Sequence, residues 1–410
     1  MNTPEISPEG ITFTEGFVYN IRNLGSIYFL ILRRITDSAH FKEEDMTTQY
    51  VTKDKALISK LSELKRNSFV SVKQGPLEKE GPTLKSQKSY ILLDVQVKNA
   101  PKVDILDDAY KNSRENVLEK SFRFLSLKTY DAHKILVARS AINKAIREYY
   151  QNLRYIEINT PKLLENYSQG GSELFEVRAP ETPGSQKYYL SQSPQLNKQI
   201  AINMGVEGVY EITPYYRAQR FKTTRHLNEP LCVDMECVNR GLSACMQNLK
   251  NLLVYISESL EKDFSVVPLK SSDFTTITYE NALDLLNQPF GYELTTKEES
   301  RICQILEKKM VFITAYPSAQ KPFYNKEGKN FDLVCSAGEL SSGGQREEDL
   351  TTLKHQLQIK KIPLGALQDY LDSFKYGLTG SMGWGLGLDR VMKYLFDYPS
   401  IRNTKIFANF

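Results

Sequence analysis

The sequence predicts an α+β protein with a small β-barrel at its N-terminus, followed by a larger domain of helices and antiparallel strands. Two observations favour this class. Residues 11–97 combine short apolar strands, turns and one short helix, and residues 209–238 form a long hairpin around a cationic loop. The 410 residues suffice for two or three domains, and a content of 41% hydrophobic and 25% charged residues is ordinary for a soluble protein.

Composition excludes several classes of function. The net charge is only +4, so any nucleic-acid-binding surface has to be local. Five scattered cysteines without a CxxC pair, and only four histidines, argue against a structural zinc site and favour reduced thiols in a cytoplasmic compartment. Because no apolar run reaches about 18 residues and no signal-peptide pattern opens the chain, we expect no membrane span.

The N-terminal third predicts the barrel. β-Branched and aromatic residues in 11–35 predict two strands with a turn at 23–25, and leucines at helical spacing predict a helix over 53–64. Residues 68–73 and 90–97 are further strand candidates, and together these elements are typical of a five-stranded barrel of the oligonucleotide-binding (OB) type. Its exposed face would combine groups that stack on bases and pair with phosphates: Arg22, Phe29, Arg33 and His40. The residues alone leave open that Phe29 belongs to the core and Arg33 to a solvated edge.

A polar, irregular segment at 98–126 predicts a linker, so we expect a barrel over 1–105, a hinge over 106–128 and the larger domain over 129–410. Residues 130–152 predict a long amphipathic helix, and 155–158 a short strand. Gly170–Gly171 predicts a turn able to close over a ligand. Ser193–Pro194 predicts the start of a helix on which Gln195 and Lys198 face the same way.

The hairpin at 209–238 carries the most informative charges. Its loop contains five cations, namely Arg217, Arg220, Lys222, Arg225 and His226, and its second strand carries Asp234 and Glu236. Arginine suits a polyanion because its planar fork binds phosphate in a bidentate manner. An ordinary hairpin with a solvated basic loop would show the same residues, so the interpretation depends on two later segments.

Residues 240–320 predict helices within a connecting module, and the chemistry returns at 330–347. There Asp332 and Glu339 lie on a strand pair, and one or two carboxylates with phosphates and waters are what holds Mg²⁺. Two solvated carboxylates remain the alternative. In 380–394, four glycines precede a helix with Arg390 in its first turn, where a cation opposes the helix dipole and is therefore better explained by phosphate binding. The GxG repeat there lies outside a βαβ unit, so a Rossmann sheet is not expected.

Three segments together resemble the signature motifs of class II aminoacyl-tRNA synthetases. They are 148–164, the hairpin with Tyr216–Arg217 and TTRHLNE at 223–229, and GLGLDR at 385–390. Within the class, QSPQLNKQ (192–199), KPFY (321–324), SSGGQRE (341–347) and FKYG (374–377) resemble aspartyl-tRNA synthetases of the archaeal and eukaryotic type. The resemblance extends from about residue 11 to residue 405, so it includes the barrel.

The resemblance implies an OB-fold anticodon-binding barrel and a catalytic domain with an antiparallel sheet flanked by helices. It implies an ATP-dependent aspartate–tRNA ligase, in which aspartate attacks the α-phosphate of ATP to give aspartyl-adenylate and the aspartyl group then passes to the 3′ end of tRNA. The implied partners are ATP with Mg²⁺, L-aspartate, the aspartate tRNA with its GUC anticodon, and a second copy of the chain in a homodimer with Pro161 at the contact.

Site roles follow from the same motifs. Arg217 and Arg390 would be catalytic and hold the α- and γ-phosphates of ATP, with further nucleotide contacts from Gln219, Arg225, His226 and Glu339. Mg²⁺ would bind Asp332, Glu339 and Ser342. Aspartate would bind Lys198 and Arg346 through its side chain, and Gln169, Gln195 and Asp234 near its α-amino group. In the barrel, Phe29 would stack on an anticodon base beside Arg22, Arg33 and His40.

The sequence also departs from the family pattern. Glutamine replaces the usual glutamate at Gln169 and Gln219, Pro230 stands where an aromatic is usual, His40 where a glutamine is usual, and Ser381–Met382 where His-Gly is usual. Two alternatives therefore stay open. One is a divergent paralogue that adenylates aspartate or a related acid for a non-tRNA acceptor, or acts as a resistant duplicate; the other is a catalytically weak tRNA- or protein-binding module. Charging of the asparagine tRNA also stays open.

Overall fold

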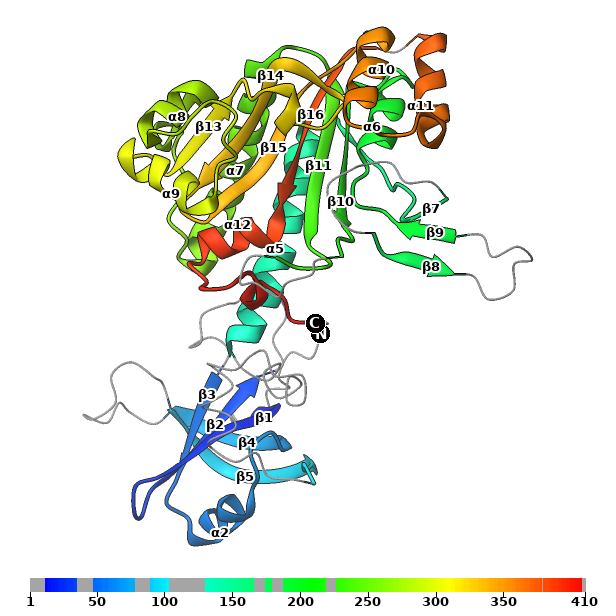
Figure 1. Cartoon of the computed structure of the whole chain (residues 1–410). Coiled ribbons are helices and arrows are strands. Elements are labelled where there is room, and N and C mark those ends of the chain that lie inside the picture. The colour runs from blue at the N-terminus through cyan, green and yellow to red at the C-terminus, as the bar shows by residue number, and fades with distance from the viewer. Residues whose placement is uncertain are drawn as a thin grey trace. The chain divides into compact units, whose positions relative to one another are not determined.

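The computed structural model describes residues 12–34, 47–77, 89–102, 130–165, 174–178, 187–218, 226–377 and 379–407. The chain divides into two compact units, Met1–Val137 and Ala138–Phe410. In Figure 1 the colour runs from blue at the start of the first unit to red at the end of the second. The predicted hinge at 106–128 lies outside the described residues, so the predicted domain limits remain predictions.

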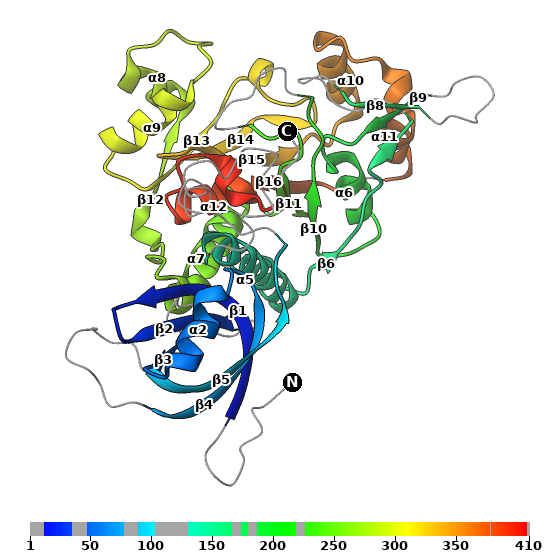
Figure 2. The ribbon, with the colours of Figure 1, turned by 90° about the horizontal axis from the view of Figure 1, so that it is seen from below.

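The first unit is a closed five-stranded barrel in the order β1-β2-β3-β5-β4, seen at the lower left of Figure 2. Its elements are β1 (Thr12–Asn23), β2 (Tyr28–Arg34), β3 (Thr47–Thr52), α2 (Lys55–Glu63), β4 (Phe69–Leu77) and β5 (Ser89–Asn99). Each strand contributes to the core, in which Leu30, Leu32, Tyr50 and Val70 are fully buried. The OB-type barrel is therefore confirmed, although its third strand, TTQYVT, is too polar to be recognised from its pattern.

The second unit is built on an eight-stranded sheet in the order β12-β13-β14-β15-β16-β11-β10-β6. Its strands are β6 (Ile156–Glu157), β10 (Gly208–Pro214), β11 (Leu231–Val238), β12 (Phe274–Thr278), β13 (Met310–Thr314), β14 (Asn325–Cys335), β15 (Gly338–Arg346) and β16 (Ser381–Gly387). Only the outer pairs β12–β13 and β10–β6 are parallel, so the mainly antiparallel sheet is confirmed. Three short strands form a second sheet: β7 (Leu163–Leu164), β9 (Lys187–Leu190) and β8 (Glu176–Arg178).

Helices cover both faces of the large sheet. They are α5 (Tyr130–Asn152), α6 (Gln195–Ile202), α7 (Leu242–Phe264), α8 (Tyr279–Leu286), α9 (Thr296–Ile305), α10 (Leu350–Ile359), α11 (Gln368–Ser373) and α12 (Leu388–Leu395). Tyr150 of α5 stacks on Tyr210 of β10, and Tyr149 donates to a carbonyl of α7, so α5 and α7 share the rear face in Figure 1. Lys198 of α6 bonds to Asp234. The side chain of Asp234 points to the opposite face of the sheet from that of Met235, which opposes Tyr210, so α6 covers the other face.

The sequence predicts most of these elements. The helix at 130–152 has the predicted bounds, and α6 begins directly after Pro194, where the Ser193 hydroxyl accepts a hydrogen bond from the Gln195 N–H at 3.2 Å. One prediction is wrong. Residues 240–320 are not a connecting module, because they supply β12 and β13 of the large sheet. No helix among the described residues is long and apolar enough to cross a membrane.

Candidate functional site

A single row of residues crosses five strands on one face of the large sheet. In the strand registers Glu211 opposes Asp234, Asp234 opposes Gly385, Gly385 opposes Ser342, and Ser342 opposes Asp332. Directly opposed residues of neighbouring strands point to the same face. The hairpin, the glycine-rich segment and the Asp332 strand are far apart in sequence, and this register brings them together.

Each of the three carboxylates in this row accepts a hydrogen bond from a lysine of another segment. The pairs are Glu211 with Lys162 at 2.7 Å, Asp234 with Lys198 at 2.7 Å, and Asp332 with Lys321. All three carboxylates are buried, and a buried charge needs such a partner. The row therefore forms a line of internally neutralised ion pairs.

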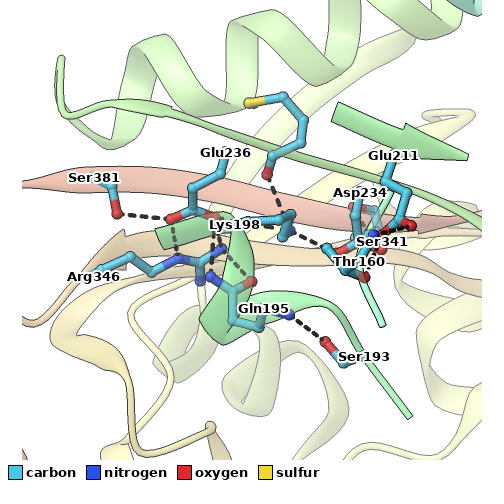
Figure 3. Close-up of polar contacts among 12 residues, drawn as sticks. Thr160, Ser193, Gln195, Lys198, Glu211, Asp234, Glu236, Ser341, Arg346 and Ser381 are labelled. Carbon is cyan, nitrogen blue, oxygen red and sulfur yellow. Dashed lines mark hydrogen bonds and ion pairs between the residues drawn. The ribbon is translucent and has the colours of Figure 1, made fainter. Parts of the chain in front are cut away.

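The deepest part of the site is a cluster around Glu236, drawn in Figure 3. Arg346 donates from Nε to Glu236 Oε1 at 2.9 Å and from Nη2 to Oε2 at 3.0 Å. Gln195 donates to Glu236 Oε2 at 3.0 Å and accepts from Arg346 at 3.1 Å, while Ser381 donates to Oε1 at 2.8 Å. Lys198 Nζ lies 3.8 Å from Glu236 and is fully buried. Two cations and a glutamine, from α6 and β15, therefore meet at one carboxylate of β11.

Charge in this cluster is held by close pairing. Burial alone would raise the pKa of Glu236, yet the Arg346 guanidinium and Lys198 hold it below its usual value, so the carboxylate is ionised. Burial raises the pKa of Asp234, with Lys198 opposing the shift. Asp234 Oδ2 is buried and has no hydrogen-bond partner within the described part of the chain. That oxygen is suited to accept a hydrogen bond from a cationic group of a ligand, such as an ammonium.

Four of the predicted aspartate-binding residues thus lie together: Gln195, Lys198, Asp234 and Arg346. Gln169 lies outside the described residues. Sequence reasoning did not assign Glu236 a role, although it shares β11 with Asp234. The alternation Asp-x-Glu on one strand was the available signal, since residues two apart point to the same face.

Electrostatic effects on two neighbouring groups link the three predicted arginines. Burial raises the pKa of Tyr324 to about 12, and Arg346 and Arg217 both oppose that shift. Burial likewise raises the pKa of Cys232 to about 12, and Arg217 and Arg390 both oppose it. Arg217 therefore shares one affected neighbour with Arg346 and another with Arg390.

The end of the site near Arg390 is more open. Arg390 lies in the first turn of α12, and its Nη1 donates to the Glu339 carbonyl at 2.6 Å and lies 3.4 Å from Glu339 Oε1. These side chains are 28% and 40% exposed. The Arg217 guanidinium lies 5.6 Å from the ring centroid of Tyr215, and His226 is exposed. Gln219 and Arg225 lie outside the described residues.

The predicted Mg²⁺ ligands depend on a β-bulge. Asp332 opposes Ser342, but the register shifts after Leu333, so that Val334 opposes Glu339. Glu339 and Ser342 are three residues apart, so in a regular strand their side chains would point to opposite faces. The bulge places the Glu339 side chain on the same face as Ser342 and Asp332. Two carboxylates and a hydroxyl on one face fit a Mg²⁺ ion that takes its remaining ligands from phosphates and waters. Among the described residues, no group of three or more His, Cys, Asp and Glu side chains forms a metal site without such outside ligands.

Glu299 of α9 is a further carboxylate at this end, and sequence reasoning missed it. It is 8% exposed and accepts a hydrogen bond from the Glu339 N–H at 3.0 Å. Burial and the nearby charge of Glu339 raise the pKa of Glu299 to about 7. It lies in a run of charged residues at a helix start, a pattern that predicts solvent exposure.

Comparisons with known proteins agree with this geometry. The family of class II tRNA synthetases for D, K and N matches residues 115–410. The chain belongs to this family. The aspartate--tRNA(Asp/Asn) ligase of Methanopyrus kandleri is 31% identical over 99% of this chain and 96% of its own length. The aspartate--tRNA(Asp) ligase of Thermococcus kodakarensis is 29% identical over 96% and 93%. The asparaginyl-tRNA synthetase of Pyrococcus horikoshii, solved with asparaginyl-adenylate, superposes with a TM-score of 0.85 at 25% identity over 99% and 96%.

In this class II synthetase the barrel has a mixed aromatic and cationic outer face. Arg22 directly opposes Phe29, and Arg33 directly opposes Phe17, whose ring centroid lies 5.5 Å from the Arg33 guanidinium. Leu30, which follows Phe29, is part of the core, so Phe29 points outward and is only half-buried. The alternative that Phe29 belongs to the core is therefore wrong. His40 lies outside the described residues.

Proposed function

We propose that this class II synthetase is an ATP-dependent aspartate–tRNA ligase that forms aspartyl-adenylate and transfers the aspartyl group to the 3′ end of tRNA. The observation that carries the proposal is the buried cluster in which Lys198 and Arg346 meet beside Asp234 Oδ2, which has no hydrogen-bond partner among the described residues. The relatives named aspartate--tRNA ligase support the same activity.

In this proposal the cluster recognises both ends of aspartate. Lys198 and Arg346 bind the side-chain carboxylate, while Gln195 and Asp234, with Gln169, bind the α-ammonium group. The pairing of both cations with the protein's own carboxylates keeps them fixed before the substrate arrives. A site that pairs a charged group rejects an analogue without that charge by orders of magnitude, so free asparagine should be a poor substrate.

In this proposal, arginines bind the phosphates of ATP at the other end of the site. Arg217 holds the α-phosphate and Arg390 the γ-phosphate, and Gln219, Arg225, His226 and Glu339 complete the ATP site. Mg²⁺ would be held by Asp332, Glu339 and Ser342 together with the phosphates, and it would neutralise phosphate charge. The chain's own contribution is to position the α-phosphate against the aspartate carboxylate and to stabilise negative charge as it develops.

The barrel is the anticodon-binding part in this proposal. Phe29 stacks on a base, and Arg22, Arg33 and His40 contact the phosphates or bases of the GUC anticodon. We assign residues 1–105 to this domain, 106–128 to a hinge and 129–410 to the catalytic domain, and we place Pro161 at a homodimer contact. All five cysteines are buried and unpaired, which fits a cytoplasmic location.

Two assays test the proposal. Aspartate-dependent exchange of pyrophosphate into ATP should occur, and transcripts of the aspartate and asparagine tRNAs, tested side by side, should show charging of the GUC transcript. A Phe29→Ala variant should retain exchange and lose tRNA affinity by about tenfold or more, the worth of one stacked base. Exchange without charging of any tRNA would instead favour the divergent paralogue, and no exchange would favour the binding module.

A further inference from the structure

The Asp332 carboxylate, assigned above to Mg²⁺, is already paired with a cation of the protein. Lys321 Nζ bonds to Asp332 Oδ1 and lies 3.5 Å from Ser342 Oγ. The two side chains are 6% and 11% exposed, so water screens the pair weakly. Lys321 is thus within reach of two of the three proposed metal ligands.

The lysine is fixed by its surroundings. Its Nζ lies 4.0 Å from the ring centroid of Tyr316, a cation–π contact in a buried setting. The Tyr316 backbone is held in turn by Asn330, which accepts from the Tyr316 N–H at 2.9 Å and donates to its carbonyl at 3.0 Å. Burial, together with the charge of Asp332, holds the pKa of Tyr316 well above its usual value, so the phenol stays neutral.

The two ligand carboxylates at this end of the site are already paired without a ligand. Asp332 and Glu339 contribute two negative charges, and Lys321 and Arg390, each bonded to one of them, contribute two positive charges. Glu299, a further carboxylate, accepts a hydrogen bond from the Glu339 N–H. A divalent cation alone therefore meets two carboxylates that already have cationic partners, and at Asp332 it lies close to Lys321.

We propose that Lys321 is an internal counter-cation that prevents Mg²⁺ from binding Asp332 until the phosphates of ATP supply the missing negative charge. The proposal rests on the proposed function, since it assumes that Asp332 is a Mg²⁺ ligand. Lys321 acts as a positioning residue here. It holds the carboxylate in place in the empty enzyme and makes entry of the metal depend on the nucleotide.

Titration of the full chain with Mn²⁺, followed by the electron paramagnetic resonance signal of free Mn²⁺, tests this without any reaction. In the absence of ATP the wild-type chain should bind Mn²⁺ weakly at this site, and Lys321→Met should bind it at least about tenfold more tightly, because a buried like charge has been removed. Lys321→Arg, which keeps the charge, should remain weak. Adding Asp332→Asn to Lys321→Met should abolish the gained affinity.

Tight Mn²⁺ binding at Asp332 in the nucleotide-free wild-type chain would overturn the proposal, and that measurement does not require any variant to fold. Equal Mn²⁺ affinity of wild type and folded Lys321→Met would overturn it as well. Pyrophosphate exchange by the wild-type chain is measured separately. Normal exchange with either of these results refutes the role of Lys321 alone, whereas absent exchange refutes the proposed function.

Discussion

The two ends of the catalytic site differ in how their charges are held. At the amino-acid end, Lys198, Glu236 and Arg346 are each at most 2% exposed, and Glu236 accepts hydrogen bonds from three side chains. At the phosphate end, Arg390 and Glu339 are 28% and 40% exposed, and their charged groups are 3.4 Å apart. The first end is preformed, whereas the second is completed by the charges of its ligand.

This difference predicts different consequences of substitution. Removing one partner of a buried ion pair leaves an uncompensated charge and destabilises the fold, whereas an exposed pair contributes at most about 1 kcal/mol. Substitutions at the amino-acid end should therefore lower stability and activity together, and those of the exposed Arg390–Glu339 pair at the phosphate end should lower activity alone.

The largest effect is expected for Arg346→Gln. It removes the bidentate partner of Glu236, so the free energy of unfolding should fall by about 3–5 kcal/mol, and exchange activity should fall by roughly a thousandfold or more. Urea unfolding and pyrophosphate exchange measure the two effects. Arg240→Gln, which breaks an exposed pair with Glu207, is the matched control and should change stability by less than about 1 kcal/mol. Equal stability of the two variants would show that the cluster is not preformed.

Arg217→Gln should produce the opposite combination. The Arg217 guanidinium lies over the ring of Tyr215 and the site beside it is partly open, so unfolding should change by less than about 1 kcal/mol. Exchange should fall by about a hundredfold to a thousandfold, because a preorganised charge on the α-phosphate is lost. Circular-dichroism melts and exchange kinetics with varied ATP separate the effects. Near-normal exchange would remove Arg217 from the nucleotide site.

A third substitution, Glu299→Gln, tests the difference between the two ends of the site through the pH dependence of stability. Glu236 has a lowered pKa, whereas the pKa of Glu299 is raised from 4.5 to about 7. Between about pH 4.5 and 7 the folded chain keeps a proton on Glu299 that the unfolded chain has lost, so this residue contributes stability at low pH that disappears as pH rises to 7. The full difference is at most about 3.5 kcal/mol, at about 1.4 kcal/mol per pKa unit.

Glutamine can still accept from the Glu339 N–H but does not titrate. Relative to wild type, Glu299→Gln should therefore gain stability between pH 5 and pH 8, measured by urea unfolding at both values. The exposed Glu258→Gln on α7 should show no such gain. A wild-type-like pH dependence in Glu299→Gln would place the carboxylate in a more polar setting than its burial indicates.

Local pattern predicted most of the fold. Alternation and turn residues identified the barrel and the 209–238 hairpin, and apolar periodicity identified the helix at 130–152. The strand TTQYVT was missed because polar residues in a closed barrel are buried by their neighbours rather than by their own hydrophobicity. The role of 240–320 was missed because membership of a sheet depends on distant partners.

The candidate site was less predictable. The motifs located Gln195, Lys198, Asp234 and Arg346, yet the residue that joins them, Glu236, required the strand register. The β-bulge that turns Glu339 to the Asp332 face leaves no mark in the residue types. Lys321 lies within a recognised segment, but its bond to Asp332 depends on how the loop before β14 folds back onto that strand.

The smallest effect is expected for Ser381→Ala, at the position where relatives usually have histidine. Its buried hydroxyl donates to Glu236 Oε1 at 2.8 Å, while Arg346 and Gln195 still satisfy the carboxylate. Unfolding should become easier by about 1–2 kcal/mol, the aspartate KM should rise several-fold, and the ATP KM should stay constant. Ser259→Ala, whose exposed hydroxyl donates to a carbonyl of its own helix at 2.7 Å, is the control. A rise in the ATP KM instead would mean that the two ends of the site are coupled through Glu236. The two ends would then differ only in solvent exposure and not in how independently they bind their ligands.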